Sequence, residues 1–417
     1  MKQVMEGSAA IAHAVARCRP QVIAAYPITP QTHIVEGLAT LVAAGDARAE
    51  FINVESEFSA ASVVLGASAT GVRAYTATSS QGVLLMTEVL YNIAGLRLPL
   101  VLTCANRAIS APISIWNDHQ DAMAVRDAGW VQLWAEDNQD AADLHVQAYR
   151  LAEQLHLPVM VNVDGFVLTH AYEPVDIADQ ESVDRFLPPR RSEHVLDPEH
   201  PISMGMLAEP QIFMEARYAH HRAMLQALVA IPQIGGAFAQ SFDRPGVSLV
   251  APYRMDGAEL AIVAMGSVLG TIKETVDQLR EEGVPVGVVK LGTYRPFPAA
   301  ALREVLAGVN RVVVLEKALS PGASAVGGIL AGDVRSALYG LWPQPKVEGT
   351  IAGLGGRDIT TAAIRDVLLD LWHQPSVPAW SPMTLMANPS RRYLGLHSTA
   401  ETVEPVYPAR TTEELPS

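Results

Sequence analysis

The chain is poor in cysteine and in basic side chains, and both shortages exclude functions. Its only cysteines are Cys18 and Cys104, so we expect no disulfide framework and a reducing compartment. An iron–sulfur cluster needs about four ligands, usually thiolates, so two cysteines cannot hold one alone. The 30 Lys and Arg residues stand against 44 Asp and Glu residues, and the net charge of −14 argues against nucleic acid or an anionic membrane as the main partner.

Long uninterrupted apolar runs are also missing. The most apolar stretch, 82–105, contains Glu88, Arg97 and Pro99, so we expect no membrane span. The apolar segment 8–12 has charged neighbours and is interpreted as part of a first helix, not as a signal peptide. With 417 residues, 49% of them hydrophobic, the chain has enough apolar material for two cores, and we expect a two-domain cytoplasmic protein.

Strand-like runs alternate with helical runs through the first part of the chain. Such alternation predicts βαβ units and an α/β fold with a mostly parallel, doubly wound sheet. Right-handed crossovers then place all the strand-to-helix turns on one edge of that sheet. The predicted strands are 21–26, 49–54, 73–78, 99–104 and 158–163, and the predicted helices are 31–44, 57–69, 83–95 and 141–154.

The pattern breaks down over 172–255, where prolines are frequent and one helix is predicted at 210–229. This segment is too long for a plain loop, so we expect it to wrap the first domain or to pack against a neighbour. A second α/β unit follows, in which Ser267 is expected to cap the helix 268–282. Its other predicted elements are 259–264, 284–290, 299–306 and 311–316.

We therefore divide the chain into a first domain over 1–240, whose segment 172–240 wraps it, a smaller α/β domain over 241–375, and an extended arm over 376–417. In the first domain, the turns that follow three predicted strands carry Thr29, Glu57 and Arg107. Open parallel sheets bind ligands at this edge. A hydroxyl, a carboxylate and a guanidinium are therefore expected to line one rim.

Other polar segments are less specific. The block Asn-Asp-His-Gln-Asp at 117–121 suggests a metal site, but it lacks metalloprotease spacing and is interpreted as a hydrogen-bonded loop without metal. The pair at 220–221, His-His, is interpreted as solvated or as part of an interface. The turn 266–270 lacks the full dinucleotide-binding pattern.

Five blocks of the sequence, in register, resemble the alpha subunit of 2-oxoacid:acceptor oxidoreductases of the pyruvate:ferredoxin oxidoreductase type. The resemblance extends over about 7–371. The blocks are Tyr-Pro-Ile-Thr-Pro at 26–30, Val-Glu-Ser-Glu at 54–57, Asn-Arg-Ala at 106–108, Asn-Asp-His-Gln-Asp at 117–121 and Arg-Asp-Ala-Gly-Trp at 126–130.

The resemblance implies a pyrimidine-binding-type domain followed by a domain similar to the transketolase C-terminal domain, which is mainly structural. Enzymes of the family oxidatively decarboxylate a 2-oxo acid to an acyl-CoA and CO2. The implied cofactor is thiamine diphosphate with Mg, shared with a partner subunit, and coenzyme A is the implied co-substrate. The turn 78–82 is expected to pack beside the cofactor.

The implied partners are a beta subunit that holds thiamine diphosphate, Mg and a cluster, together with gamma and ferredoxin-like delta subunits. An NAD-reducing flavoprotein subunit is a further option, and [4Fe-4S] clusters are expected in the partners only. The sequence agrees, because it has no Gly-Asp-Gly stretch followed by paired asparagines. Gly332-Asp333 lacks the following glycine, and Asp164-Gly165 lacks the leading one.

The resemblance assigns Glu57 to the carboxylate that meets N1′ of the aminopyrimidine, with Glu55 as its surface-facing neighbour. Burial against a ring raises the pKa of a carboxyl, which favours sharing a proton with the ring nitrogen. The alternative is that Glu57 merely complements the dipole in the first turn of its helix.

Arg107 is assigned to the substrate carboxylate, which a guanidinium can meet bidentately. The alternative is a surface arginine paired with Asp118 or Asp121. Thr29 is assigned to the substrate carboxylate or ketone oxygen, with Pro27 shaping the wall beside the thiazolium ring. The alternative for Thr29 is capping of the following helix.

The substrate and two other classes of function stay open. Family abundance favours pyruvate, whereas total length and the extended tail look similar to phenylglyoxylate dehydrogenase, an NAD-reducing relative. A self-sufficient transketolase-like thiamine enzyme is opposed by the missing diphosphate-binding motif. A non-catalytic binding or scaffold protein is the remaining alternative, and co-purification with cysteine-rich partners would count against it.

Overall fold

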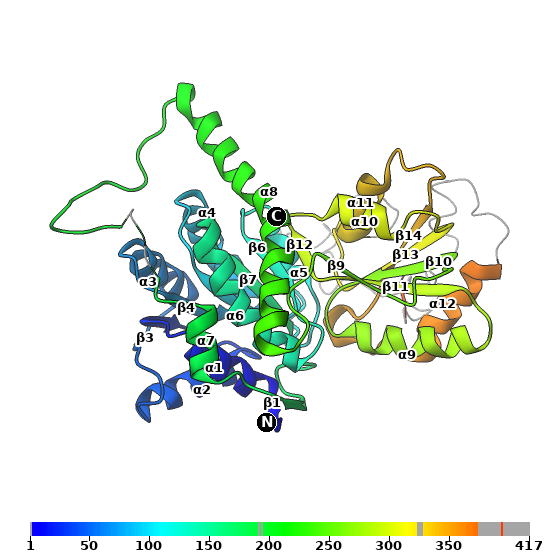
Figure 1. Cartoon of the computed structure of the whole chain (residues 1–417), viewed down its shortest axis with the longest axis horizontal. Coiled ribbons are helices and arrows are strands. Elements are labelled where there is room, and N and C mark those ends of the chain that lie inside the picture. The colour runs from blue at the N-terminus through cyan, green and yellow to red at the C-terminus, as the bar shows by residue number, and fades with distance from the viewer. Residues whose placement is uncertain (1, 191, 193–194, 323–327, 374–392, 395–417) are drawn as a thin grey trace, which may run out of the picture.

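The computed structural model describes residues 2–190, 192, 195–322, 328–373 and 393–394 (Figure 1). Apart from 393–394, the predicted arm over 376–417 lies outside the described residues. Cys18 and Cys104 are both free and buried.

A seven-stranded sheet forms the centre of the N-terminal unit, and the predicted α/β fold is confirmed. Six of its seven strands are parallel. The chain places its second parallel strand, β3, on one side of β2 and then crosses over to place β4 on the other side, so the strand order reverses between β2 and β4. The five predicted strands are all present, with ends shifted by one or two residues. The sheet order is β12 (Thr293–Arg295), β6 (Val131–Trp134), β7 (Val159–Asp164), β5 (Val101–Asn106), β4 (Ala74–Thr78), β2 (Val22–Ala25) and β3 (Glu50–Asn53).

Helices cover both faces of this sheet because the side chains of its central strands alternate between two apolar clusters. Tyr75 and Val101 face one cluster, whereas Ala74 and Leu102 face the other. Helices α3 (Glu57–Ala69), α4 (Gln81–Gly95) and α5 (Gln120–Ala124) pack on one side, and α1 (Gly7–Arg17), α2 (Thr32–Ala43) and α6 (Asn138–Leu155) pack on the other.

The C-terminal unit is a smaller five-stranded sheet with helices on both faces. Its edge strand β9 is antiparallel and the other strands are parallel. The strands are β9 (Val250–Tyr253), β10 (Leu260–Ala264), β11 (Val286–Leu291), β13 (Arg311–Glu316) and β14 (Lys346–Ile351), and the helices are α9 (Val268–Glu281), α10 (Ala299–Val305), α11 (Ile329–Leu338), η1 (Leu354–Gly356) and α12 (Thr361–His373).

The two units share a sheet edge and a core. Strand β12, which follows the C-terminal strand β11, pairs antiparallel with β6 of the N-terminal sheet. One apolar cluster runs from Trp134 in β6 through Tyr294 in β12 to Val289 in β11. The N-terminal sheet is therefore completed by residues that follow it by well over a hundred positions.

The first part of the segment after β7 packs on the N-terminal unit. Strand β8 (Tyr172–Val175) pairs with β1 (Gln3–Glu6), and α7 (Gln180–Phe186) packs its Phe186 edge-on against Phe238 of helix α8. Neither β8 nor α7 was predicted from the sequence.

Helix α8 extends over Pro210–Phe242, well beyond the predicted end at 229, and the predicted domain boundary at 240 lies inside it. Pro232 favours a stop because proline removes a helical hydrogen bond, yet the helix continues through it. The interpretation of both histidines as solvated or interfacial was wrong for His220, which is buried against the Gly129 carbonyl.

Among the described residues, α8 is the one helix that is long and apolar enough to cross a membrane. Its C-terminal half packs against α6, whereas its first residues project from the molecule (Figure 1). Phe213 and Met214 in the projecting part are exposed.

Two adjacent glycines of α8 give a matched test of this packing. A Cβ on Gly235 would lie 2.1 Å from the Val247 carbonyl oxygen, whereas a Cβ on Gly236 would meet nothing within 4 Å. We expect Gly235→Ala to lower the free energy of unfolding by about 1–3 kcal/mol through overpacking. Gly236→Ala should raise it by up to about 1 kcal/mol through helix propensity. Urea unfolding measures both changes, and equal effects of the two substitutions would contradict the packing.

Candidate active site

The three predicted site segments meet at the carboxyl edge of the N-terminal sheet. Thr29 follows β2 and Arg107 follows β5, and β4 lies between these two strands. Glu57 begins α3, which follows the edge strand β3 and packs over β2 and β4. The site thus lies where the strand order reverses, which is where open α/β sheets bind ligands.

Arg107 and Thr29 are in direct contact. The Arg107 Nη1 donates to the Thr29 carbonyl at 2.8 Å, and its Nε donates to the Ser114 carbonyl at 3.0 Å. Arg107 is buried, so the alternative of a surface arginine is wrong, and burial lowers the pKa of its guanidinium. Within the described residues, no acceptor is recorded for its Nη2, which is therefore available to an anion.

The turn that carries Thr29 is fixed to the neighbouring strand. The buried Gln31 side chain donates to the Ala77 carbonyl in β4 at 2.6 Å. The residue that precedes α2 is Gln31, so the alternative of Thr29 as the helix cap is wrong. Thr29 and Pro27 both lie exposed on this turn, open to a ligand.

Glu57 is a buried carboxylate at the first position of α3, and Ser56 caps this helix by accepting from the Ser59 N–H. Its exposed neighbour Glu55 accepts from the Ser59 hydroxyl instead. A Cβ on Gly82 would lie 2.9 Å from Glu57 Oε1, so glycine at this position leaves room for the carboxylate.

Two unsatisfied polar side chains lie in the turn around Gly82, the residue against which this carboxylate packs. Over the part of the chain that the structure describes, Glu57 has no recorded hydrogen-bond donor, and the buried Thr78 Oγ1 and Gln81 Nε2 have no partner. Buried polar groups are normally paired, so these atoms indicate a missing polar ligand. A carboxylate, a hydroxyl and an amide fit the nitrogens of an aminopyrimidine.

Asp121 connects the separate turns of the site, a role that the sequence did not reveal. Its Oδ2 accepts from the backbone N–H groups of Ser80 at 3.0 Å and Arg107 at 2.9 Å, and its Oδ1 accepts from the Asn106 side chain at 3.0 Å. Burial raises the pKa of Asp121, although these hydrogen bonds favour the ionised form. The block at 117–121 includes Asp121. From the sequence, however, the carboxylates of this block were interpreted only as possible metal ligands or as partners for arginine.

The same block joins the two units through a buried ionic cluster. Asp164 at the end of β7 contacts His119 at 2.6 Å and Lys317 of the C-terminal unit at 2.9 Å. Burial acts to raise the pKa of Asp164, but Lys317 and His119 hold it well below its usual range. Ser267 is the N-cap residue of α9, as expected, but its side chain makes no cap hydrogen bond. Its hydroxyl donates to Asp164 at 2.5 Å instead.

The block at 117–121 is hydrogen-bonded, as predicted, but it is a loop only as far as His119, because Gln120 and Asp121 begin helix α5. In the described residues, another group of side chains is close enough together to hold a metal ion. It consists of Glu6, His33 and His170, whose possible ligand atoms lie within 4.8 Å of one another. His33 Nδ1 contacts Glu6 at 2.7 Å, and its ring lies 4.5 Å from that of His170. Hydrogen bonding and ring packing account for these contacts, and we assign no metal to them.

Two known families match most of the chain. The family described as "Pyruvate flavodoxin/ferredoxin oxidoreductase, thiamine diP-bdg" matches residues 13–235, and "Pyruvate:ferredoxin oxidoreductase core domain II" matches residues 258–364. The fold and the site therefore define a thiamine-diphosphate-binding oxidoreductase chain. The chain belongs to the pyruvate:ferredoxin oxidoreductase family and is an alpha-subunit type of that family.

Curated relatives cover nearly the same length. The pyruvate synthase subunit PorA of Methanosarcina barkeri is 48% identical over 368 residues, which are 88% of this chain and 91% of the relative. The PorA of Thermotoga maritima is 47% identical over 89% of this chain and 95% of the relative. The ketoisovalerate oxidoreductase subunit VorA of Pyrococcus abyssi is 42% identical over 89% of this chain and 93% of the relative.

A solved structure supports the fold. The 2-oxoglutarate:ferredoxin oxidoreductase from Magnetococcus marinus, with 2-oxoglutarate, coenzyme A and succinyl-CoA bound, matches with a TM-score of 0.68 and 20% sequence identity. The match covers 89% of this chain and 65% of the solved chain, so this chain spans just under two thirds of that structure.

The ionisation of Asp118, just before helix α5, is expected to make the free energy of unfolding depend on pH. Burial raises the pKa of its carboxyl to about 6, although it accepts hydrogen bonds from the Gln120 and Gly355 N–H groups. The folded state therefore binds this proton more tightly than the unfolded state does. The contribution of Asp118 to the free energy of unfolding is present below about pH 4 and is lost as the pH rises through about 6.

Asp118→Asn should remove this dependence and keep an oxygen acceptor. The free energy of unfolding of the parent, minus that of the variant, should fall by about 2–3 kcal/mol between about pH 4 and pH 7. Urea unfolding at several pH values measures this difference. A difference that stays constant with pH would contradict the raised pKa.

Proposed function

We propose that this chain is the alpha subunit of a multi-subunit, CoA-acylating 2-oxoacid oxidoreductase that decarboxylates pyruvate in the cytoplasm and delivers electrons to ferredoxin. The observation that carries the proposal is the position of the buried Glu57 carboxylate and of the Arg107–Thr29 pair at one sheet edge. The names of the PorA relatives support pyruvate, and 42% identity to a ketoisovalerate subunit keeps a branched substrate as the nearest competitor.

Glu57 is the proposed acid–base residue. When bound, thiamine diphosphate supplies the nucleophilic carbon and the electron sink for decarboxylation. The Glu57 carboxylate shares a proton with ring nitrogen N1′ of that cofactor, while Thr78 and Gln81 orient the ring. Because Glu57 is buried, water does not compete for this proton.

Arg107 and Thr29 are the proposed substrate-binding residues, and Pro27 shapes the adjacent wall. Two contacts, with Ser114 and Thr29, hold the guanidinium in place before substrate binds, and its Nη2 is left for the substrate carboxylate. A group held in its binding geometry loses little further freedom on binding. Asp121 acts as a positioning residue through the backbone of Arg107.

Partner subunits are required by this proposal. The chain has two cysteines, so the [4Fe-4S] clusters belong to other subunits, and a beta subunit is proposed to hold the diphosphate and Mg, with gamma and delta subunits completing the complex. Exposed apolar side chains around the carboxyl edge support a covering partner. They are Tyr26, Phe58, Ile113, Ile115, Trp116 and Val167.

Glu57→Gln tests the acid–base role. The amide keeps the size of the side chain but cannot accept and return a proton, so we expect kcat of the purified complex with pyruvate to fall by about 100-fold or more. Subunit composition and thermal unfolding should be unchanged. Glu55→Gln, on the exposed neighbour, is the control and should retain activity. Near-normal turnover of the Glu57 variant would remove it from the site.

Arg107→Lys tests substrate binding. Lysine keeps the charge but loses the planar pair of donors, so we expect KM for pyruvate to rise about tenfold or more, with a smaller change in kcat. Arg217→Lys on the exposed part of α8 is the control. Parallel assays with pyruvate, 2-oxoisovalerate and phenylglyoxylate, with ferredoxin or NAD as acceptor, identify the substrate. An unchanged KM for every substrate would exclude Arg107 from the pocket.

A further inference from the structure

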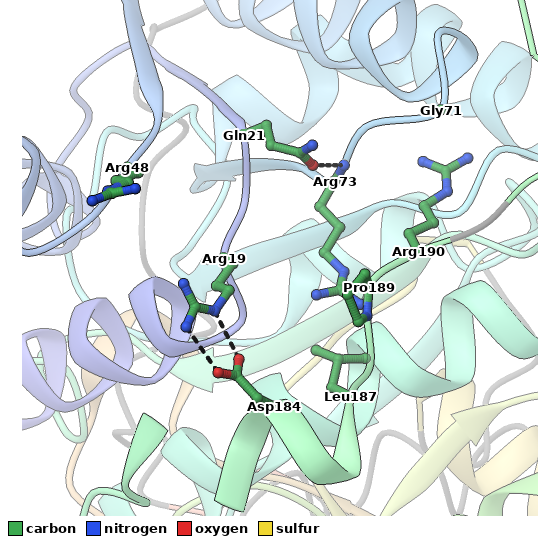
Figure 2. Close-up of a pocket in the computed structure, with 9 residues that line it drawn as sticks. All are labelled: Arg19, Gln21, Arg48, Gly71, Arg73, Asp184, Leu187, Pro189 and Arg190. Carbon is green, nitrogen blue, oxygen red and sulfur yellow. Dashed lines mark hydrogen bonds and ion pairs between the residues drawn. The ribbon is translucent and has the colours of Figure 1, made fainter. Parts of the chain in front are cut away.

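A second polar pocket lies at the opposite edge of the N-terminal sheet, where the strands begin. It encloses about 540 Å³, which is within the usual range for small-molecule sites. Gln21 precedes β2, Arg48 precedes β3 and Arg73 precedes β4, while α7 and the residues after it close the other side (Figure 2). No residue assigned to the candidate active site lines it.

Four guanidinium groups line this pocket, and two of them are neutralised. Arg19 makes a bidentate pair with Asp184 at 2.7 and 2.8 Å (Figure 2). Arg73 makes a second pair, with Glu153, at 2.6 and 3.0 Å. These pairs hold the walls of the pocket in place.

The other two arginines form no recorded ion pair within the described residues. Arg190 donates to the Val72 carbonyl at 2.6 Å and to the Ser68 carbonyl at 3.2 Å, which are neutral acceptors. Arg48 is exposed, and within the described residues it has no recorded hydrogen bond or ion pair. Two positive charges therefore exceed the carboxylates at this pocket, in a chain whose net charge is −14.

The polar atoms left free in the pocket are mainly N–H donors. The Nη1 of Arg19 and all the nitrogens of Arg48 have no recorded acceptor in the described part of the chain. Gln21 uses its carbonyl to accept from the Arg73 N–H at 2.8 Å, which leaves its amide group to donate. Donors without acceptors, on a positively charged wall, are typical of sites for phosphate oxygens.

We propose that this pocket binds a phosphate-bearing ligand of nucleotide size, such as a nucleoside diphosphate. Guanidinium groups line the pocket at several positions, and its volume exceeds what a single phosphate ion fills. Leu187 and Pro189 supply an apolar wall for the rest of the ligand. A purely structural role explains Arg190, which binds the Ser68 carbonyl near the end of α3 and the Val72 carbonyl after it, but it explains neither Arg48 nor the open volume.

Isothermal titration of the full-length chain with ADP, pyrophosphate and adenosine tests the proposal. ADP and pyrophosphate should bind with one-to-one stoichiometry, adenosine should not bind, and added NaCl should weaken the affinity. Arg48→Met should weaken ADP binding about tenfold or more, because it removes a free guanidinium. Arg222→Met, on an exposed face of α8, is the matched control and should bind ADP as the parent does.

Absence of binding of both phosphates by the parent would overturn the proposal, as would equal ADP affinity of the parent and the Arg48 variant. An equal loss in the Arg222 variant would also overturn it, since binding would then follow overall charge. Binding of pyrophosphate without ADP would overturn the nucleotide-sized ligand. The pocket lies at the edge opposite the candidate active site, so Arg48→Met should leave turnover of the complex without nucleotide unchanged. The outcome of this test is therefore independent of the role proposed for Glu57.

Discussion

The buried ionic cluster around Asp164 is the interaction on which the rest of the site depends. A carboxylate with no solvent exposure is held by His119 from the loop 117–119 and by Lys317 from the C-terminal unit. Loss of either partner would leave an uncompensated buried charge, which is strongly destabilising. Helix α5, which follows His119 directly, carries Asp121, whose side chain fixes the backbone of Arg107. The relation between the two units therefore sets the geometry of the proposed substrate site.

Much of the fold and of the rim was predictable from local sequence. Strands β4 and β5 are buried at every position and contain no charged residue, and the turns after β2 and β5 carry Thr29 and Arg107 to one edge. This follows because parallel sheets with right-handed crossovers leave few topologies. The pairing of Arg107 with the Thr29 carbonyl could not be predicted, since it depends on how two turns far apart in the sequence approach each other.

The features that were missed depend on long-range contacts. Strand β12 is three residues long and exists because β6 offers it an edge. Ser267 has the composition of a helix cap, but a buried carboxylate from the other unit attracts its hydroxyl more strongly. His220 is polar, and only the tertiary packing of α8 on Gly129 buries it. Local propensity yields to tertiary context in each case.

Strand β12 also limits how the two halves of such a chain can be exchanged during evolution. The two family matches, 13–235 and 258–364, look like separable modules along the sequence. In the folded molecule, a recombination breakpoint between them would pair β6 with a β12 strand from a different parent, and a poor match would leave a sheet edge open to non-native pairing. The two matched regions are separate along the sequence, but in the folded protein they share one sheet. Exchange of one region alone would therefore be selected against.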